Sequence, residues 1–302
     1  MSFLSLDLSL TGELAALSAA CLWAVASVIY SRVGQTIHPL ELNLFKGAIA
    51  VVLLLFTIFI SGDVLPPLAF NDYLFFILSG MLGIGLGDSA FLTALKYLGA
   101  RRTLLMETLA PPMTAILALL FLQEQLSFAA WCGIILTIVG IAWVLSERTP
   151  NIGTHHPTHL LRGISFGILA AIALATGAVL SRAVFATTTV SSLWAALLRL
   201  SGGLCILIPW VALKTRSSGL KLPSRRAIAA IFIASFTGTY LGIWLQQTAI
   251  KLTAAGIALT LTNTSPLFVL PLAAAMGERI SFRAIAGVAI AIAGIAVLFY
   301  LQ

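Results

Sequence analysis

Long apolar stretches separated by short polar connections set the pattern of this chain. Each stretch has about 20 residues, the length a helix needs to cross the hydrocarbon core of a bilayer. Open strands are excluded there, because lipid cannot satisfy their backbone N–H and C=O groups. The pattern therefore predicts an all-α polytopic membrane protein with ten transmembrane helices. They are expected at residues 13–31, 39–60, 73–95, 103–121, 129–146, 163–181, 192–213, 228–249, 257–276 and 284–301.

The second half of the chain repeats landmarks of the first half at an offset of 154 or 155 residues. Ala94, Lys96, Pro112, Glu124, Ser127, Phe128, Gly133 and Gly140 correspond to Ala249, Lys251, Pro266, Glu278, Ser281, Phe282, Gly287 and Gly294. Such self-similarity indicates an internal duplication. Because small residues let helices approach closely, we expect the helix with Gly133 and Gly140 to pack on the helix with Gly287 and Gly294.

The number of helices per repeat fixes how the two halves are related. Five helices carry the chain to the opposite side of the membrane, so the second copy enters in the reverse direction and the repeats are inverted. We expect a first five-helix repeat at 1–147, a polar linker at 148–162 and a second five-helix repeat at 163–302. His155, His156 and His159 are expected to be solvated in the linker, since no acidic or cysteine ligand lies nearby.

Composition agrees with a lipid environment. Hydrophobic residues make up 60% of the chain and charged residues only 9%, with a mean hydropathy of +1.07. A soluble globular domain is excluded. The three cysteines, Cys21, Cys132 and Cys205, all fall in predicted helices, which predicts packing residues rather than disulfides.

The net charge of +7 reports orientation rather than a nucleic-acid partner. Thirteen of the 17 basic residues fall in alternate connections, on one predicted face. The opposite face has only Arg182 and Lys251, and Lys46 and Arg199 lie within predicted helices. The basic face is expected to be cytoplasmic, which places both termini outside. The only partner that this charge implies is the anionic membrane surface.

Four charged residues, Lys46, Asp88, Glu107 and Arg199, lie well inside predicted helices, where charge is costly unless it faces protein, water or a counter-charge. Lys46 shares a helix face with Asn43, and Arg199 is its counterpart in the second repeat. Both could line a cavity, or their long stems could carry the charges to the interface. Asp88 and Glu107 are the two carboxylates at comparable depth. Glu124 and Glu278 come at helix ends and are expected to cap helices or to pair with bases such as Arg279 and Arg283.

Prolines interrupt the fourth and ninth predicted helices, at Pro111–Pro112 and at Pro266. Proline removes a backbone donor and bends a helix. Glu107 precedes one break and Asn263 the other. Helices broken at matching places in two repeats point to the binding site of a transporter. The alternative is a structural kink without ligand contact.

Two further helix faces carry polar or aromatic side chains. The first predicted helix presents Trp23, Ser27, Tyr30 and Ser31 on one side, with Trp23 deeper than the interfacial aromatic belt. This face could form the wall of a cavity or be an ordinary packing surface. The eighth predicted helix carries Ser235, Thr239, Gly242 and Gln246 in a stripe, as expected of a cavity lining or of a tight polar contact between helices.

Several of these motifs together resemble the EamA-type permeases of the drug/metabolite transporter superfamily. They are Leu22–Trp23, Lys46 and Arg199, Ala-Leu-Lys-Tyr-Leu-Gly-Ala at 94–100, the proline and glutamate landmarks, and Gly-x6-Gly in both halves. The resemblance covers nearly the full chain. It implies ten helices in two five-helix repeats and the export or exchange of small metabolites.

The sequence thus predicts a secondary active transporter in the cell (inner) membrane, moving small polar or amphipathic metabolites such as amino acids by alternating access. The expected substrate-binding residues are Trp23, Asn43, Lys46, Asp88, Glu107, Arg199, Gln246 and Asn263. No nucleophile–base pair, Walker loop or paired catalytic carboxylates indicate an enzyme, and no cofactor is expected beyond a proton or another coupling ion. The protein would work as a monomer or homodimer among membrane lipids, without nucleic acid.

Two other functions fit part of the pattern. A lipid or multidrug flippase would need an apolar groove open to the bilayer. A membrane scaffold without a substrate path would have Lys46, Arg199 and Asp88 fully paired with one another and a dry interior.

Overall fold

A computed structural model describes residues 2–34, 36–145, 157–218, 224–275 and 281–300. Within these ranges the chain is entirely helical, and no strand is present. The first half forms α1 (Ser2–Val33), α2 (Pro39–Ser61), α3 (Phe70–Gly80), η1 (Met81–Asp88), α4 (Ser89–Glu107), α5 (Ala110–Leu122) and α6 (Phe128–Leu145). The second half forms α7 (Pro157–Thr187), α8 (Ser192–Ser218), α9 (Arg225–Ala234), η2 (Ser235–Leu241), α10 (Gly242–Leu252), α11 (Ala255–Thr262), α12 (Ser265–Ala275) and α13 (Phe282–Tyr300).

Seven helical segments in the described ranges are long and apolar enough to cross a membrane, and three more apolar segments are shorter. The short ones are Ala110–Leu122, Phe128–Val144 and Ala255–Val269. Two of the three lie at the predicted helix breaks. Ala110–Leu122 begins after one break, and Ala255–Val269 contains the other. The chain is therefore a polytopic membrane protein. The length and composition of the described helices support seven membrane crossings.

Two predicted connections differ from the structure. The prediction of a basic connection at 96–102 is wrong, because α4 continues through these residues without interruption. Its Ala, Leu, Lys and Arg residues are strong helix formers, and a single glycine does not end the helix. The polar linker expected at 148–162 ends early, since α7 begins at Pro157 and includes His159 and Arg162. Proline is tolerated in the first turn of a helix, where its missing N–H would have no partner. His155 and His156 lie outside the described residues.

The helix breaks predicted from proline are confirmed. α4 ends at Glu107 and α5 begins at Ala110, while α11 ends at Thr262 and α12 begins at Ser265. A second irregularity also recurs in both halves. The π-helical segments η1 and η2 begin at Met81 and Ser235, which are 154 residues apart, the same offset as the sequence landmarks. Such segments are uncommon and cluster at functional sites.

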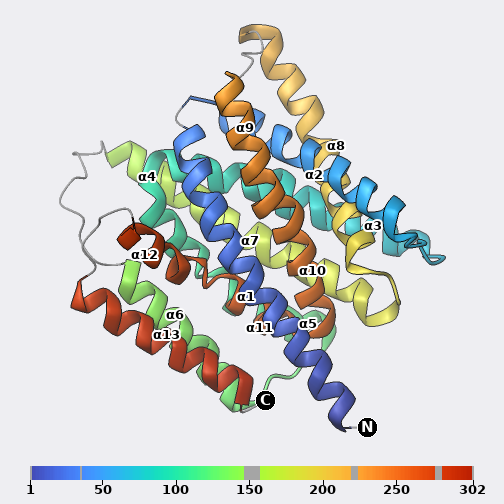
Figure 1. Cartoon of the computed structure of the whole chain (residues 1–302), viewed down its shortest axis with the longest axis vertical. Helices are drawn as coiled ribbons and strands as arrows, with labels where there is room; N and C mark the ends of the chain where they lie inside the picture. Colours follow the sequence, from blue (N-terminus) through green and yellow to red (C-terminus); the bar gives the residue numbers. More distant parts are fainter. Residues whose placement is uncertain (1, 35, 146–156, 219–223, 276–280, 301–302) are drawn as a thin grey trace.

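The expected packing of the glycine-marked helices is also confirmed. α6 and α13 lie side by side along their length (Figure 1). A Cβ atom at Gly140 would overlap the backbone of Ala291, and one at Gly287 would lie 3.0 Å from the carbonyl oxygen of Gly140. Glycine is required here because the two backbones touch.

α1 and α7 each pack against the opposite half of the chain. α1 packs against α10, η2, α11 and α12 of the second half, and α7 packs against α3, η1, α4 and α5 of the first half. Each half therefore packs one of its helices against several helices of the other half. α3 and η1 lie so close to α8 that a Cβ atom at Gly80 would overlap the backbone of Arg199.

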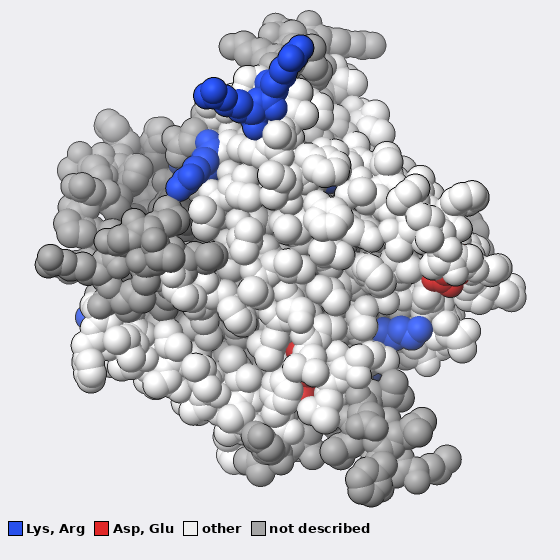
Figure 2. Space-filling model, viewed as in Figure 1, with Lys and Arg blue, Asp and Glu red and all other residues white. Residues whose placement is uncertain are grey.

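Basic side chains are concentrated at one end of the helices. Figure 2 shows an almost uncharged surface over the middle of the molecule, with Lys and Arg near the upper end, where Figure 1 places the start of α9. Arg32 at the end of α1 and Arg225 and Arg226 at the start of α9 belong to this basic end. The three cysteines are free and exposed, so the prediction that they are packing residues is wrong. A cysteine side chain is small and apolar, and it can therefore also face lipid on the outside of a helix.

Candidate functional site

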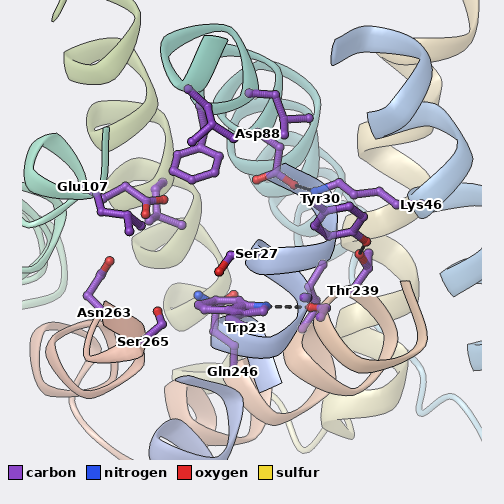
Figure 3. A pocket seen from close by; sticks show the side chains of 18 of the residues that line it. Trp23, Ser27, Tyr30, Lys46, Asp88, Glu107, Thr239, Gln246, Asn263 and Ser265 are labelled. Atoms are coloured by element: carbon purple, nitrogen blue, oxygen red, sulfur yellow. Dashed lines mark hydrogen bonds and ion pairs between the residues drawn. The ribbon is translucent and has the colours of Figure 1, made fainter. Parts of the chain in front are cut away.

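A cavity of about 410 Å³ lies between the two halves of the chain. Its polar lining comes from α1, α2, η1, the end of α4, α8, η2, α10 and the break between α11 and α12 (Figure 3). The polar and charged side chains of the wall are Trp23, Ser27, Tyr30, Arg32, Lys46, Asp88, Glu107, Arg199, Thr239, Gln246, Asn263 and Ser265. The apolar part of the wall includes Phe91, Leu92, Leu95, Leu104, Leu174 and Val269.

Lys46 and Asp88 form an ion pair on this wall. Lys46 comes from the middle of α2 and Asp88 from the last position of η1, and Figure 3 shows the two side chains meeting beside Tyr30. The Lys46 ammonium also lies 5.8 Å from the centre of the Tyr30 ring, within cation–π range. Lys46 is therefore held in the interior by a counter-charge and an aromatic ring, and does not extend to the membrane surface.

Arg199, in contrast to Lys46, forms no ion pair within the part of the chain that the structure describes. Its side chain is only 2% exposed, and its Nε and Nη1 atoms are buried without a hydrogen-bond partner. The third nitrogen, Nη2, would lie 3.1 Å from a Cβ atom added at Gly83, another residue of the wall. The absence of a side chain at Gly83 thus leaves room for the guanidinium tip at the cavity.

Hydrogen bonds hold α1 against η2 at the cavity wall. Trp23 Nε1 donates to the carbonyl oxygen of Gly238 at 2.6 Å, a bond drawn in Figure 3. The Tyr30 hydroxyl lies 3.0 Å from the Thr239 hydroxyl and donates to Ser235 at 3.4 Å. The predicted aromatic face of α1 and the predicted polar stripe of η2 and α10 are therefore partners, and both also line the cavity.

Glu107, Asn263 and Ser265 lie together on the opposite side of the cavity from the Lys46–Asp88 pair (Figure 3). Glu107 is the last residue of α4, and Asn263 and Ser265 flank the break between α11 and α12. The two helix breaks thus bring polar side chains from both halves of the chain to one wall.

Asn43 does not line the cavity, contrary to the prediction. It is fully buried, and its Nδ2 donates to the carbonyl oxygen of Ile84 at 2.9 Å and to Ser89 Oγ at 3.0 Å. Ser89 Oγ in turn donates to the carbonyl oxygen of Gly85 at 2.6 Å. A π-helical turn disturbs the regular backbone ladder, and Asn43 and Ser89 bond to its carbonyl groups. Asn43 therefore positions η1, and with it Asp88.

The cavity reaches the basic end of the molecule, because exposed Arg32 is part of its wall. The other end is closed by a polar network around Glu124 and Arg182. Glu124 pairs with Arg182 and accepts a hydrogen bond from Ala255 N at 3.1 Å, at the start of α11. Arg182 Nη1 donates to the carbonyl oxygens of Ile250 and Lys251, each at 2.9 Å.

The expected capping role of Glu124 is confirmed, but its base is Arg182 of the other half. Gln123 makes this possible, since its left-handed backbone, with φ of 56°, turns the chain at the end of α5. Arg283 instead stacks on Trp143, 5.3 Å from the ring centre. Glu278 and Arg279 lie outside the described residues.

Seven of the eight predicted binding residues thus meet at one cavity, and Asn43 lies behind its wall. Ser27, Tyr30, Thr239 and Ser265 belong to the wall as well. Their signal in the sequence was helical spacing from Trp23 and Gln246, and adjacency to Asn263. The apolar wall residues gave no signal, because every helix here is rich in leucine and phenylalanine.

Comparison with known proteins identifies the family. The model of the EamA-like transporter family matches twice, over residues 10–146 and 161–300. A protein of Archaeoglobus fulgidus, described as an uncharacterized transporter, is 27% identical over 297 residues, covering 94% of this chain and 96% of its own. A solved structure, described only as the crystal structure of a protein, has the same fold, with a TM-score of 0.77 at 16% identity and coverage of 95% of both chains. This membrane protein therefore belongs to the EamA-like transporter family.

Proposed function

We propose that the protein is a secondary transporter that carries small metabolites bearing a carboxylate through this cavity. The observation that carries the proposal is Arg199, a buried guanidinium at the cavity wall that forms no ion pair among the described residues. An unpaired charge in a membrane interior is costly, so such residues usually serve a substrate or ion path. A carboxylate in the cavity would form an ion pair with the guanidinium, approaching it at Nη2, the nitrogen next to Gly83 of the wall.

The size of the cavity fits a small solute. Ligand pockets for drug-sized molecules span about 300–1,000 Å³, and 410 Å³ lies near the lower limit. Phe91, Leu95 and Leu104 give the wall an apolar side that suits an amphipathic metabolite. Amino acids and related compounds combine the required features.

The two ends of the cavity suggest how transport would proceed. Following the charge bias, we place the basic end, where the cavity opens, in the cytoplasm. The Glu124–Arg182 network then closes the extracytoplasmic side, and alternating access requires that it break while the basic end closes. The matched helix breaks and π-helical segments support two inverted five-helix repeats as the basis of this exchange. Loading from the cytoplasm corresponds to export.

The pairing pattern disfavours a scaffold. A scaffold would have Lys46, Arg199 and Asp88 satisfied by one another around a dry interior. Instead, Lys46 and Asp88 pair while Arg199 has free donors, and a cavity separates the two halves.

A ligand panel tests the proposal. Ligand binding to the folded state raises its stability by RT ln(1 + [L]/Kd), so thermal unfolding of the purified protein reports binding. Amino acids, nucleosides, sugars, organic cations and lipids would be compared in wild type, Arg199→Gln and the control Arg226→Gln, which changes an exposed arginine. We expect carboxylate compounds to stabilise wild type and the control but not Arg199→Gln. Stabilisation by lipids or apolar cations alone, unaffected by Arg199→Gln, would instead favour a flippase.

A further inference from the structure

Glu107 and Asn263 face one another at the two helix breaks. Figure 3 shows both side chains directed into the same part of the cavity, with Ser265 beside Asn263. They come from different halves of the chain, α4 in the first and the α11–α12 break in the second. This grouping is separate from the Lys46–Asp88 pair across the cavity.

Hydrogen bonding determines which atoms this group offers to a ligand. Asn263 Nδ2 donates to the carbonyl oxygen of Leu259 at 3.0 Å, which turns the amide oxygen toward the cavity. The Ser265 hydroxyl donates to the carbonyl oxygen of Thr262 at 3.3 Å, so its lone pairs remain available. Both side chains therefore present acceptors, as does the Glu107 carboxylate.

Glu107 forms no ion pair in the described part of the chain. Lys46, on the opposite wall, is already paired with Asp88. The neighbouring wall residues Leu104, Leu174 and Val269 can neither donate a hydrogen bond nor carry charge. A carboxylate among apolar groups and other acceptors is stabilised by a cation that donates several hydrogen bonds.

We propose that Glu107, Asn263 and Ser265 form a subsite for a primary ammonium group. The inference rests on the proposed function, which assigns the carboxylate to Arg199. An ammonium has three N–H donors, one for each acceptor of the group. The substrate is then a zwitterion, whose carboxylate binds at Arg199 and whose ammonium binds at Glu107, Asn263 and Ser265.

Compounds that share one carbon skeleton separate the two subsites. Thermal unfolding of the purified full-length protein would be measured with leucine, 4-methylpentanoate and 3-methylbutylamine, and with phenylalanine, 3-phenylpropionate and 2-phenylethylamine. We expect the amino acid of one series to bind wild type at least tenfold more tightly than either analogue. In Glu107→Gln we expect the amino acid to bind no more tightly than its des-amino analogue. The affinity of the des-amino analogue should stay at the wild-type value. In Arg199→Gln both lose affinity.

Asn263→Ala provides a second variant that leaves Glu107 in place. It should also reduce the affinity for the amino acid relative to the des-amino acid. Equal binding of amino acid and des-amino acid to wild type overturns the ammonium subsite and leaves the carboxylate proposal standing. Unchanged amino-acid affinity in Glu107→Gln, together with loss of the pH dependence of transport, also overturns it and assigns Glu107 to a proton. No shift with any of the six compounds contradicts both proposals.

Discussion

Lys46 of α2 and Asp88 at the end of η1 form an ion pair inside the membrane-spanning part of the protein, at the wall of the central cavity. Only 11% of the Lys46 side chain is exposed, against 31% for Asp88. The Asp88 carboxylate is thus more accessible to a solute than the Lys46 ammonium. The buried ammonium depends on this carboxylate for its counter-charge.

Replacing Asp88 with Asn should abolish transport and destabilise the protein. The substitution leaves Lys46 as an unpaired interior charge, and losing one partner of a buried pair costs about 3 kcal/mol or more. The unfolding free energy of Lys46→Gln/Asp88→Asn should recover part of this loss, because no charge is then stranded. Full transport by Asp88→Asn at every pH would remove Asp88 from the mechanism.

Replacing Gly83 with Ala should weaken carboxylate binding while keeping every charge. The added Cβ atom would lie 3.1 Å from Arg199 Nη2 and press on the guanidinium tip. Gly85→Ala is the matched control in the same segment, since its Cβ atom would meet no atom closer than 3.4 Å. Binding measured by thermal shift should fall in Gly83→Ala and hold in Gly85→Ala; equal effects of the two changes would argue against a role for Arg199.

Replacing Glu124 with Gln should loosen the closed end of the cavity. The change removes the ion pair with Arg182, and buried charged hydrogen bonds contribute about 1.5–3 kcal/mol each. Glu41→Gln is the control, because the Lys214–Glu41 pair is longer, at 3.7 Å, and connects neighbouring helix ends. Its loss should cost less than about 1 kcal/mol. Similar unfolding free energies for the two variants would contradict a closing role for Glu124.

Replacing Gly140 with Leu should separate α6 from α13. The larger side chain would overlap the backbone of Ala291, and overpacking of this kind costs about 1–3 kcal/mol or more. Ile135→Leu changes an exposed position of the same helix and serves as the control. A midpoint of thermal unfolding for Gly140→Leu that matches the control would show that the two helices do not depend on this contact.

Much of the fold could be predicted from the sequence because lipid restricts the choices. The length of the apolar stretches predicts helices, and Pro111, Pro112 and Pro266 predict the breaks that the structure shows. The glycines at 140 and 287 predict the α6–α13 contact for the same steric reason that the structure displays. Each of these rules depends on residues close together in the chain or on the repeat itself.

The π-helical segments and the pairing of charges could not be predicted in this way. η1 has an ordinary apolar, glycine-rich sequence, and its form depends on Asn43 reaching across from α2. Likewise, no basic residue lies near Glu124 in the sequence, and Arg279 and Arg283 lie near its counterpart Glu278. Glu124 pairs with Arg182 because α7 packs against the first half. Local patterns place residues at a depth and on a face, whereas partners depend on how the two halves pack.

Counterflow in proteoliposomes measures whether the protein transports carboxylate metabolites through this cavity. Vesicles loaded with unlabelled leucine or phenylalanine would be diluted into a trace of the same labelled amino acid, with wild type, Arg199→Gln and Arg226→Gln compared. We expect transient accumulation of label with wild type and Arg226→Gln and none with Arg199→Gln. Accumulation that persists in Arg199→Gln, or its absence with every variant, would contradict transport of carboxylate metabolites through this cavity.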